Sequence, residues 1–267
     1  MPATILSATE NRFAVLDVFR AAPPADLEEM ARRTCARGDR GLDGLLLLAP
    51  PVHGGDCRMV LYNPDGSRPE ACGNGLRCIA KLAVERGYTA GDSLVIETDA
   101  GLRAARVHRE SGVVRRATVD MGVPRLLAQD VRLATVRGPQ LVDLVDMGNP
   151  HCVLFVADAT ETPVEELGPE IEKHGRFPAR TNVDFVAVRP DGLAVRFWER
   201  GVGETASCGS GAAAAAAAAI ARRRATSPVL VRTAGGTLRV QWDGRGLLRL
   251  EGAVSEVEGE ISLDGEG

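Results

Sequence analysis

The sequence predicts an α+β fold made of two similar halves. Three observations support this prediction. The first is that the motif Cys-Gly-x-Gly occurs twice, at Cys72 and Cys208. The second is that similar segments surround both copies, and the third is that each copy begins a helical segment between short apolar runs. A polar residue precedes each cysteine by nine positions, Asn63 in the first half and Glu199 in the second. Landmarks that stay in register over most of a chain indicate an internal duplication.

Each half is expected to place its helices among several strands. Short apolar runs are typical of strands, and a glycine-containing break marks the end of a helix. The expected strands lie near residues 13–18, 45–48, 58–62, 94–97, 152–156, 185–188, 194–198, 229–233 and 238–241. The expected helices cover residues 25–37, 73–86, 164–173 and 209–224.

The boundary between the halves is expected near residues 122–124. The first domain then covers residues 1–121 together with the tail 255–267 and carries Cys72, and the second covers 122–254 and carries Cys208. The helix after Cys208 continues with a run of alanines. Such a featureless helix fits where strands approach closely on all sides, so we expect it to be enclosed by its sheet.

Composition excludes several classes of protein. The chain has 267 residues, 45% of them hydrophobic, and a formal charge of −4. It has no basic block for nucleic acid, no apolar run long enough for a membrane and no leader-like start, so we expect neither nucleic-acid binding, nor a membrane span, nor a signal peptide. Its six cysteines show no CxxC spacing, which argues against a metal site. Cys35, Cys57 and Cys152 are expected to be small buried hydrophobic residues.

The two Cys-Gly-x-Gly motifs predict acid–base chemistry. A helix N-terminus has free N–H groups and partial positive charge, which stabilise a thiolate. Inverting a stereocentre requires a base on one face of a carbon and an acid on the other, which two opposed thiols supply. We therefore expect Cys72 and Cys208 to be the catalytic pair, in a cleft between the halves. Backbone N–H groups would stabilise the carbanion; the expected contributors are Gly73, Asn74, Gly209 and Ser210.

These residues resemble the diaminopimelate epimerase family over nearly the whole chain. The resemblance rests on five segments: Tyr62-Asn63-Pro64-Asp65-Gly66-Ser67, Ala71-Cys72-Gly73-Asn74-Gly75-Leu76-Arg77, Met147-Gly148-Asn149-Pro150-His151, Glu199-Arg200-Gly201-Val202-Gly203-Glu204-Thr205 and Ser207-Cys208-Gly209-Ser210-Gly211. It implies two pseudo-symmetric domains, each a curled, mostly antiparallel sheet around a central helix. It also implies a cytoplasmic homodimer that interconverts LL- and meso-2,6-diaminopimelate without a cofactor.

The resemblance also assigns roles to individual residues. His151 and Glu199 become the residues that tune the pKa of the thiols. The substrate-binding residues become Asn11, Asn63, Asn149, Asn182, Glu199 and Arg200. A bidentate pair between Arg200 and a carboxylate would suit a substrate that is a double amino acid.

The sequence departs from the family at two places. The segment that usually reads His-Gly-x-Gly-Asn-Asp-Phe is Ser7-Ala8-Thr9-Glu10-Asn11-Arg12-Phe13 here. Gly44 stands where some members carry a substrate-contacting glutamine. The changed N-terminal segment favours a second hypothesis, a racemase or epimerase of the same fold acting on another amino acid, whereas Asn182, Glu199 and Arg200 oppose it. A third hypothesis is a thiol hydrolase that uses one cysteine with His151, which the duplicated motif opposes, and a fourth is a non-catalytic binding module.

Overall fold

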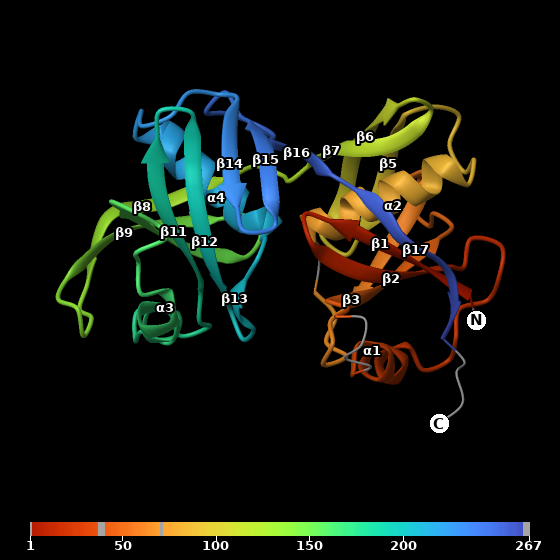
Figure 1. Ribbon diagram of the computed structural model, residues 1–267, viewed down its shortest axis with the longest axis horizontal. Coiled ribbons are helices and arrows are strands. Elements are labelled where there is room, and N and C mark those ends of the chain that lie inside the picture. Colours follow the sequence, from red (N-terminus) through yellow and green to blue (C-terminus); the bar gives the residue numbers. More distant parts are fainter. Residues whose placement is uncertain (1, 37–40, 70–71, 264–267) are drawn as a thin grey trace. The chain divides into compact units, whose positions relative to one another are not determined.

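The computed structural model describes residues 2–36, 41–69 and 72–263, and it divides the chain into two compact units (Figure 1). The first unit comprises residues 1–119 with 251–267, and the second comprises residues 120–250. The helices are α1 (Leu27–Ala36), α2 (Gly73–Glu85), α3 (Val164–Glu172) and α4 (Gly209–Ala221).

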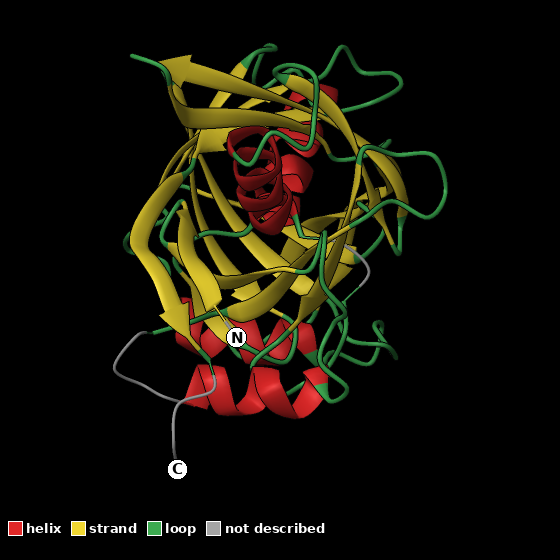
Figure 2. Ribbon diagram, turned by 90° about the vertical axis from the view of Figure 1, so that its right-hand side faces the viewer, coloured by secondary structure: helices red, strands yellow, loops and turns green. Residues whose placement is uncertain are grey.

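The first unit is a mostly antiparallel sheet curled around α2. Its strands are β1 (Pro2–Ala8), β2 (Asn11–Asp17), β3 (Gly44–Ala49), β4 (Cys57–Tyr62), β5 (Ser93–Thr98), β6 (Gly101–Glu110), β7 (Val113–Asp120), β16 (Arg249–Ala253) and β17 (Ser255–Ser262). The β2–β3 and β4–β5 pairs are parallel, whereas β1–β2, β3–β4, β5–β6, β6–β7 and β1–β17 are antiparallel. Helix α2 contacts β1 to β6, and Figure 2, which faces this unit, shows a helix within a ring of strands.

The second unit repeats this arrangement. Its strands are β8 (Arg125–Leu133), β9 (Gln140–Asp146), β10 (Pro150–Val156), β11 (Asn182–Arg189), β12 (Gly192–Glu199), β13 (Gly203–Thr205), β14 (Val229–Thr233) and β15 (Gly236–Gln241). The pairs β9–β10, β11–β12 and β14–β15 are antiparallel, and the crossover pairs β10–β11 and β12–β14 are parallel. Successive strand pairs from β9 to β15 are therefore antiparallel, parallel, antiparallel, parallel and antiparallel. The pairs from β1 to β6 follow the same order. The fold class expected from the sequence is confirmed.

Strands β3 and β11 are covered on both faces, which fixes the direction of their side chains. In β3, Leu45 and Leu47 belong to the core beneath α1, while Leu46 points to α2 at Gly75. In β11, Val183 and Phe185 belong to the core beneath α3. Because side chains alternate along a strand, Asn182 and Asp184 project to the opposite face, which belongs to α4.

Small residues allow α4 to lie inside its sheet. Ala212 to Ala219 are all fully buried, and α4 contacts β9, β10, β11, β12, β14 and β15. The enclosed alanine helix expected from the sequence is therefore present. A larger side chain here would overfill a close-packed interior.

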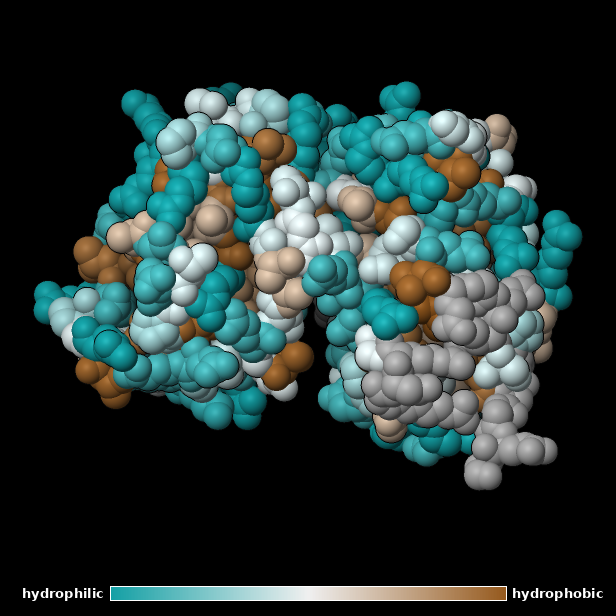
Figure 3. Space-filling model, in the orientation of Figure 1, coloured by the Kyte–Doolittle hydropathy of each residue, from teal (hydrophilic) through white to brown (hydrophobic). Residues whose placement is uncertain are grey.

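The surface of the protein carries mainly polar residues. On the face in Figure 3, hydrophobic residues occur as small separate areas between hydrophilic ones. None of the helices described in the structure has the length and apolar character needed to cross a membrane.

Candidate active site

Cys72 is the N-cap residue of α2 in the first unit. Its extended backbone (φ −146°, ψ 120°) turns the side chain back over the first helical turn, where Sγ accepts a hydrogen bond from the Gly75 N–H at 3.5 Å. The side chain is half-buried. A helix N-terminus and an N–H donor both favour the thiolate form. The role of Cys72 as an acid or base stays a prediction.

Two expected substrate-binding asparagines meet beside this helix. Asn74 is buried in the first turn of α2, and its Nδ2 donates to Oδ1 of Asn11. Burial raises the pKa of Asp43, and the nearby side chain of Asn11 opposes that rise. Asn11 begins β2 directly after a tight turn in which Thr9 and Glu10 both have positive φ (50° and 67°). The residue that replaces a family glycine, Glu10, thus stands where glycine would be unstrained.

Arg77, one helical turn after Asn74, was given no role by the sequence. Its side chain is fully buried, and Nη2 donates to Thr9 Oγ1 and to Asn74 Oδ1, each at 2.8 Å. Burial lowers the pKa of Arg77 to about 10. Arg77 stands within the motif that carries the family resemblance, but only the fold shows that it is buried beside the first-unit site.

Asn63 lies in the loop that follows β4. Its backbone N–H donates to Ser67 O at 2.8 Å, its Nδ2 donates to Ser67 Oγ at 2.9 Å, and its carbonyl accepts from the Gly66 N–H. The residue therefore shapes the turn, as Asn residues often do. Its role as a substrate ligand stays a prediction.

Gly44 begins β3 and has no room for a side chain in this structure. A Cβ atom there would lie 2.8 Å from the Tyr62 carbonyl oxygen and 3.1 Å from Leu61 Cδ1. The glutamine that some family members carry at this position would thus require β4 to shift.

Cys208 is the N-cap residue of α4, but its surroundings differ from those of Cys72. Its Sγ donates to Glu199 Oε2 at 3.2 Å and lies 3.5 Å from Ser210 Oγ. Burial raises the pKa of Cys208 well above its usual value, and the nearby carboxylates of Glu199 and Asp184 raise it further. Hydrogen bonds from the Ser210 hydroxyl and the Gly211 N–H lower this pKa, but they do not offset the rise. At α4, burial and negative charge therefore raise the thiol pKa by more than the helix N-terminus lowers it.

Glu199 ends β12 and is held on both sides. Thr205 Oγ1 donates to Oε1 at 2.6 Å, and Cys208 donates to Oε2. Burial raises the pKa of Glu199, although these two hydrogen bonds and nearby His151 oppose the rise. A carboxyl group in this position can exchange a proton with the thiol.

His151 is buried on β10 and belongs to a chain of hydrogen bonds. Its Nδ1 lies 2.9 Å from Asp184 Oδ2, and its Nε2 lies 3.1 Å from Asn149 Oδ1. Asn149 Nδ2 in turn reaches Ser210 Oγ at 3.4 Å. The ring is thus fixed by a carboxylate on one side and by the expected substrate-binding asparagine on the other. Asp184 was not singled out from the sequence, because an acidic residue inside a strand carries no motif.

Asn182 and Arg200 meet at the base of the β12–β13 loop. Asn182 Oδ1 accepts from the Arg200 N–H at 3.0 Å, and its Nδ2 donates to the Pro150 carbonyl at 2.9 Å. The Arg200 guanidinium is exposed and donates to the Ala179 carbonyl at 3.1 Å. Among the described residues it has no carboxylate partner within 4 Å. Arg200 is therefore available to an anionic group of a ligand.

The structure thus forms two groups from the expected residues. Within the first unit, Asn11, Cys72, Gly73 and Asn74 lie together, with Asn63 in a separate loop. Within the second unit, hydrogen bonds connect Asn149, His151, Glu199, Cys208 and Ser210, with Gly209 in the same helical turn and Asn182 bonded to the backbone of Arg200.

The remaining cysteines have environments that suppress ionisation. None of the six cysteines forms a disulfide. Burial raises the pKa of Cys35 to about 11 and those of Cys57 and Cys78 to about 12, and it also raises that of Cys152. The prediction that Cys57 and Cys152 are buried is confirmed, whereas Cys35 is only partly buried.

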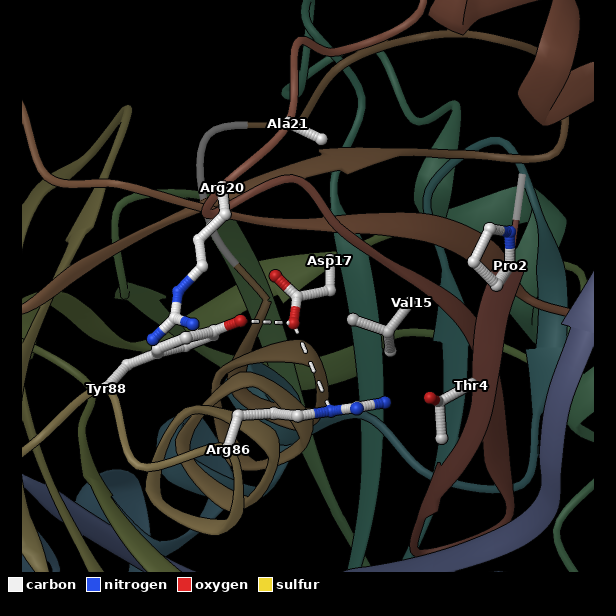
Figure 4. Close-up of a pocket in the computed structure, with 8 residues that line it drawn as sticks. All are labelled: Pro2, Thr4, Val15, Asp17, Arg20, Ala21, Arg86 and Tyr88. Atoms are coloured by element: carbon white, nitrogen blue, oxygen red, sulfur yellow. Dashed lines mark hydrogen bonds and ion pairs between the residues drawn. The ribbon is translucent and has the colours of Figure 1, made fainter.

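A separate pocket of the first unit involves none of these residues. Figure 4 shows Asp17 in this pocket, where its carboxylate accepts from the Tyr88 hydroxyl at 2.7 Å and pairs with Arg86 at 4.0 Å. The cavity measures about 230 Å³. It is lined by Pro2, Thr4, Val15, Asp17, Arg20, Ala21, Arg86 and Tyr88.

Comparison with solved structures supports the fold. A hydroxyproline epimerase from Agrobacterium vitis, with bound trans-4-hydroxy-L-proline, superposes with a TM-score of 0.76 at 21% identity, covering 99% of this chain and 93% of that chain. A Bacillus anthracis phenazine biosynthesis protein of the PhzF family superposes with a TM-score of 0.76 at 14% identity, covering 98% and 99%. At these identities the likeness concerns the fold alone.

Sequence comparison is more specific. The family model described as diaminopimelate epimerase matches residues 3–127 and 144–257. The diaminopimelate epimerase of Moorella thermoacetica is 42% identical over 246 residues, covering 87% of this chain and 88% of that protein. That of Halorhodospira halophila is 42% identical over 275 residues, covering 97% and 94%. The chain belongs to the diaminopimelate epimerase family.

Proposed function

We propose that this protein is a cofactor-independent isomerase that interconverts LL- and meso-2,6-diaminopimelate, with Cys72 and Cys208 as its acid and base. The observation that carries the proposal is the duplicated unit, in which each cysteine caps a helix enclosed by its own sheet. Family membership supports the substrate.

The proposed chemistry needs a proton acceptor and a proton donor on opposite faces of the α-carbon. The thiolate of one cysteine removes the α-proton, and the thiol of the other delivers a proton to the opposite face. The α-proton of an amino acid is a very weak acid, so the developing carbanion needs directed donors. The first-turn N–H groups at Gly73, Asn74, Gly209 and Ser210 are proposed to bind the reacting carboxylate and supply this stabilisation.

Groups around Cys208 support proton transfer at that thiol. Glu199 accepts the hydrogen bond of Cys208 at 3.2 Å and is proposed to take up and return its proton. His151, held by Asp184 and Asn149, is proposed as the second group that tunes the thiols.

The second amino-acid end of the substrate explains the remaining polar residues. Arg200 is exposed and has no acidic partner among the described residues, so we propose that it binds the distal carboxylate. Asn11, Asn63, Asn149 and Asn182 are proposed to bind the substrate's other polar groups. Asn182 also holds the Arg200 backbone, which positions this loop.

A broader setting follows from this activity. The product serves lysine and peptidoglycan biosynthesis, and we propose a cytoplasmic homodimer that acts without pyridoxal phosphate. A second candidate is the same reaction on another amino acid. It is favoured by the altered turn at Thr9 and Glu10 and by the lack of space at Gly44.

Isotope incorporation tests the proposal. In heavy water, LL-diaminopimelate should yield meso product with deuterium at one α-carbon, while recovered substrate keeps its original hydrogen early in the reaction, because separate groups serve the two faces. Cys72→Ala and Cys208→Ala should each abolish epimerisation, and Cys35→Ala and Cys57→Ala should preserve it. Epimerisation by either of the first two variants would contradict the two-thiol mechanism. Turnover of another amino acid but not diaminopimelate would favour the second candidate.

A further inference from the structure

Among the residues that the structure describes, Arg77 is a buried cation without a carboxylate partner. No part of its side chain is exposed, and within the described part of the chain only Nη2 has hydrogen-bond acceptors, Thr9 Oγ1 and Asn74 Oδ1. Its Nε and Nη1 atoms are buried without a partner. No acidic side chain among the described residues lies within 4 Å of the guanidinium. A buried charge is costly unless an opposite charge compensates it, so this arrangement calls for an anion nearby.

The anion that fits this position is a cysteine thiolate. Long side chains on a helix point toward its N-terminus, and the contact with Asn74 shows that the guanidinium lies over the first turn of α2, which Cys72 caps. The charge of Arg77 interacts with two thiols, those of Cys72 and Cys78. Burial raises the pKa of Cys78 to about 12, so Cys78 stays protonated. Cys72 is left as the thiol whose ionisation Arg77 can favour.

The second unit has no cation at the equivalent place, and its thiol lies near acidic groups instead. Ala213 follows Cys208 by the same five positions by which Arg77 follows Cys72, so α4 offers no cation there. Cys208 instead faces the carboxylates of Glu199 and Asp184, which hold its proton in place. Arg77 therefore adds positive charge near Cys72, whereas Glu199 and Asp184 add negative charge near Cys208.

We propose that Arg77 is a positioning residue that supplies the positive charge for a Cys72 thiolate, so that in the resting protein Cys72 is the charged thiol and Cys208 carries the proton. This inference rests on the proposed function for its meaning, since it assigns the resting base and the resting acid of that reaction. The hydrogen bonds of Arg77 to Thr9 and Asn74 hold the guanidinium over the helix N-terminus.

The rate of alkylation of each thiol against pH tests the inference without any substrate. Wild-type protein is treated with iodoacetamide between pH 5 and 10, and the modified sites are quantified by tandem mass spectrometry. Cys72 should react with a midpoint at lower pH than Cys208, and Cys78 should stay unmodified in the folded protein. An equal or higher midpoint for Cys72 would overturn the inference, whatever the behaviour of any variant.

Variants separate the charge from a purely structural role. Arg77→Met removes the cation at similar size and should raise the Cys72 midpoint by about one pH unit, which is about a tenfold loss of reactivity near pH 7. Arg77→Lys should keep the midpoint close to wild type. The matched control Thr9→Val removes a hydrogen bond of Arg77 but not its charge, so it should leave the midpoint in place.

The outcomes distinguish this inference from the proposed function. An unchanged midpoint in folded Arg77→Met, or an equal shift in Thr9→Val, would show a structural role and overturn it. If Arg77→Met does not fold, as judged by circular dichroism, the wild-type order and Arg77→Lys decide the question. A protein with the expected alkylation pattern that exchanges no α-proton would disprove the proposed activity while the charge assignment stands.

Discussion

Replacing Gly211 with alanine should destabilise the protein, although alanine normally stabilises a helix. A Cβ atom at Gly211 would lie 2.6 Å from Asp184 Oδ1 and 2.7 Å from Phe197 Cδ1, well inside van der Waals contact. Overpacking costs about 1–3 kcal/mol, and displacing Asp184 also weakens its hydrogen bond to His151 by about 1 kcal/mol. Against this, alanine contributes about 1 kcal/mol of helix propensity. The net expected loss is about 2 kcal/mol, or about 4–8 °C in Tm.

The duplicated fold supplies a matched control for this experiment. Gly75 is the equivalent position of the first unit, and a Cβ there would meet Leu46 Cδ2 at 3.2 Å and Met59 Sδ at 3.4 Å, the ends of flexible apolar side chains. Gly75→Ala should therefore change stability by less than about 1 kcal/mol. Gly175→Ala, where a Cβ would meet nothing within 4 Å, gives the baseline. Denaturant unfolding measures all three, and a Gly211→Ala protein as stable as wild type would refute the close approach of Asp184 to α4.

Three further predictions concern binding, strain and pH. Arg200→Ala should lose about 1.5–3 kcal/mol of transition-state stabilisation, roughly 10–150-fold in kcat/KM, for diaminopimelate but not for substrates with one carboxylate; an equal loss for both in steady-state assays would contradict its role. Glu10→Gly should raise stability in urea unfolding by about 1 kcal/mol, because glycine adopts the φ of 67° without strain, and a decrease would argue against this turn. Because burial raises the pKa of Glu199, ionisation of this group destabilises the fold at pH above that pKa. Glu199→Gln should thus unfold at higher urea than wild type at pH 8, and the difference should shrink as pH falls toward 4.5; a constant difference would show that ionisation is not its cause.

The sequence located several buried strands, although it missed β1, whose residues are mostly buried. The runs expected near residues 45–48 and 185–188 lie in β3 and β11, whose side chains are buried on both faces. Strands β6 and β8 were not expected, because charged and exposed residues interrupt their apolar pattern. Their pairing depends on neighbours from other parts of the chain, which a local pattern does not show.

The motif cysteines were located from the sequence, but the charges around them were not. A Cys-Gly-x-Gly motif indicates the helix N-terminus, and both cysteines do cap a helix. The charge near each thiol comes from residues that only the fold brings together, such as Asp184 on β11 and the guanidinium of Arg77. Local reasoning therefore gave both thiols the same environment, whereas the structure gives them different ones.

The course of the chain through the first unit affects how the protein is made. Strand β1 has two neighbours, β2 on one edge and β17 on the other, with Pro2 opposite Ser262. Because the second unit precedes β17 in the chain, it is synthesised in full before β17. Until β17 is made, one edge of β1 has no partner strand. Ile5 and Leu6, fully buried in the finished protein, lie on this strand. An unpaired hydrophobic edge is a site of aggregation, so a nascent chain, or one truncated before residue 255, needs protection that the complete protein does not.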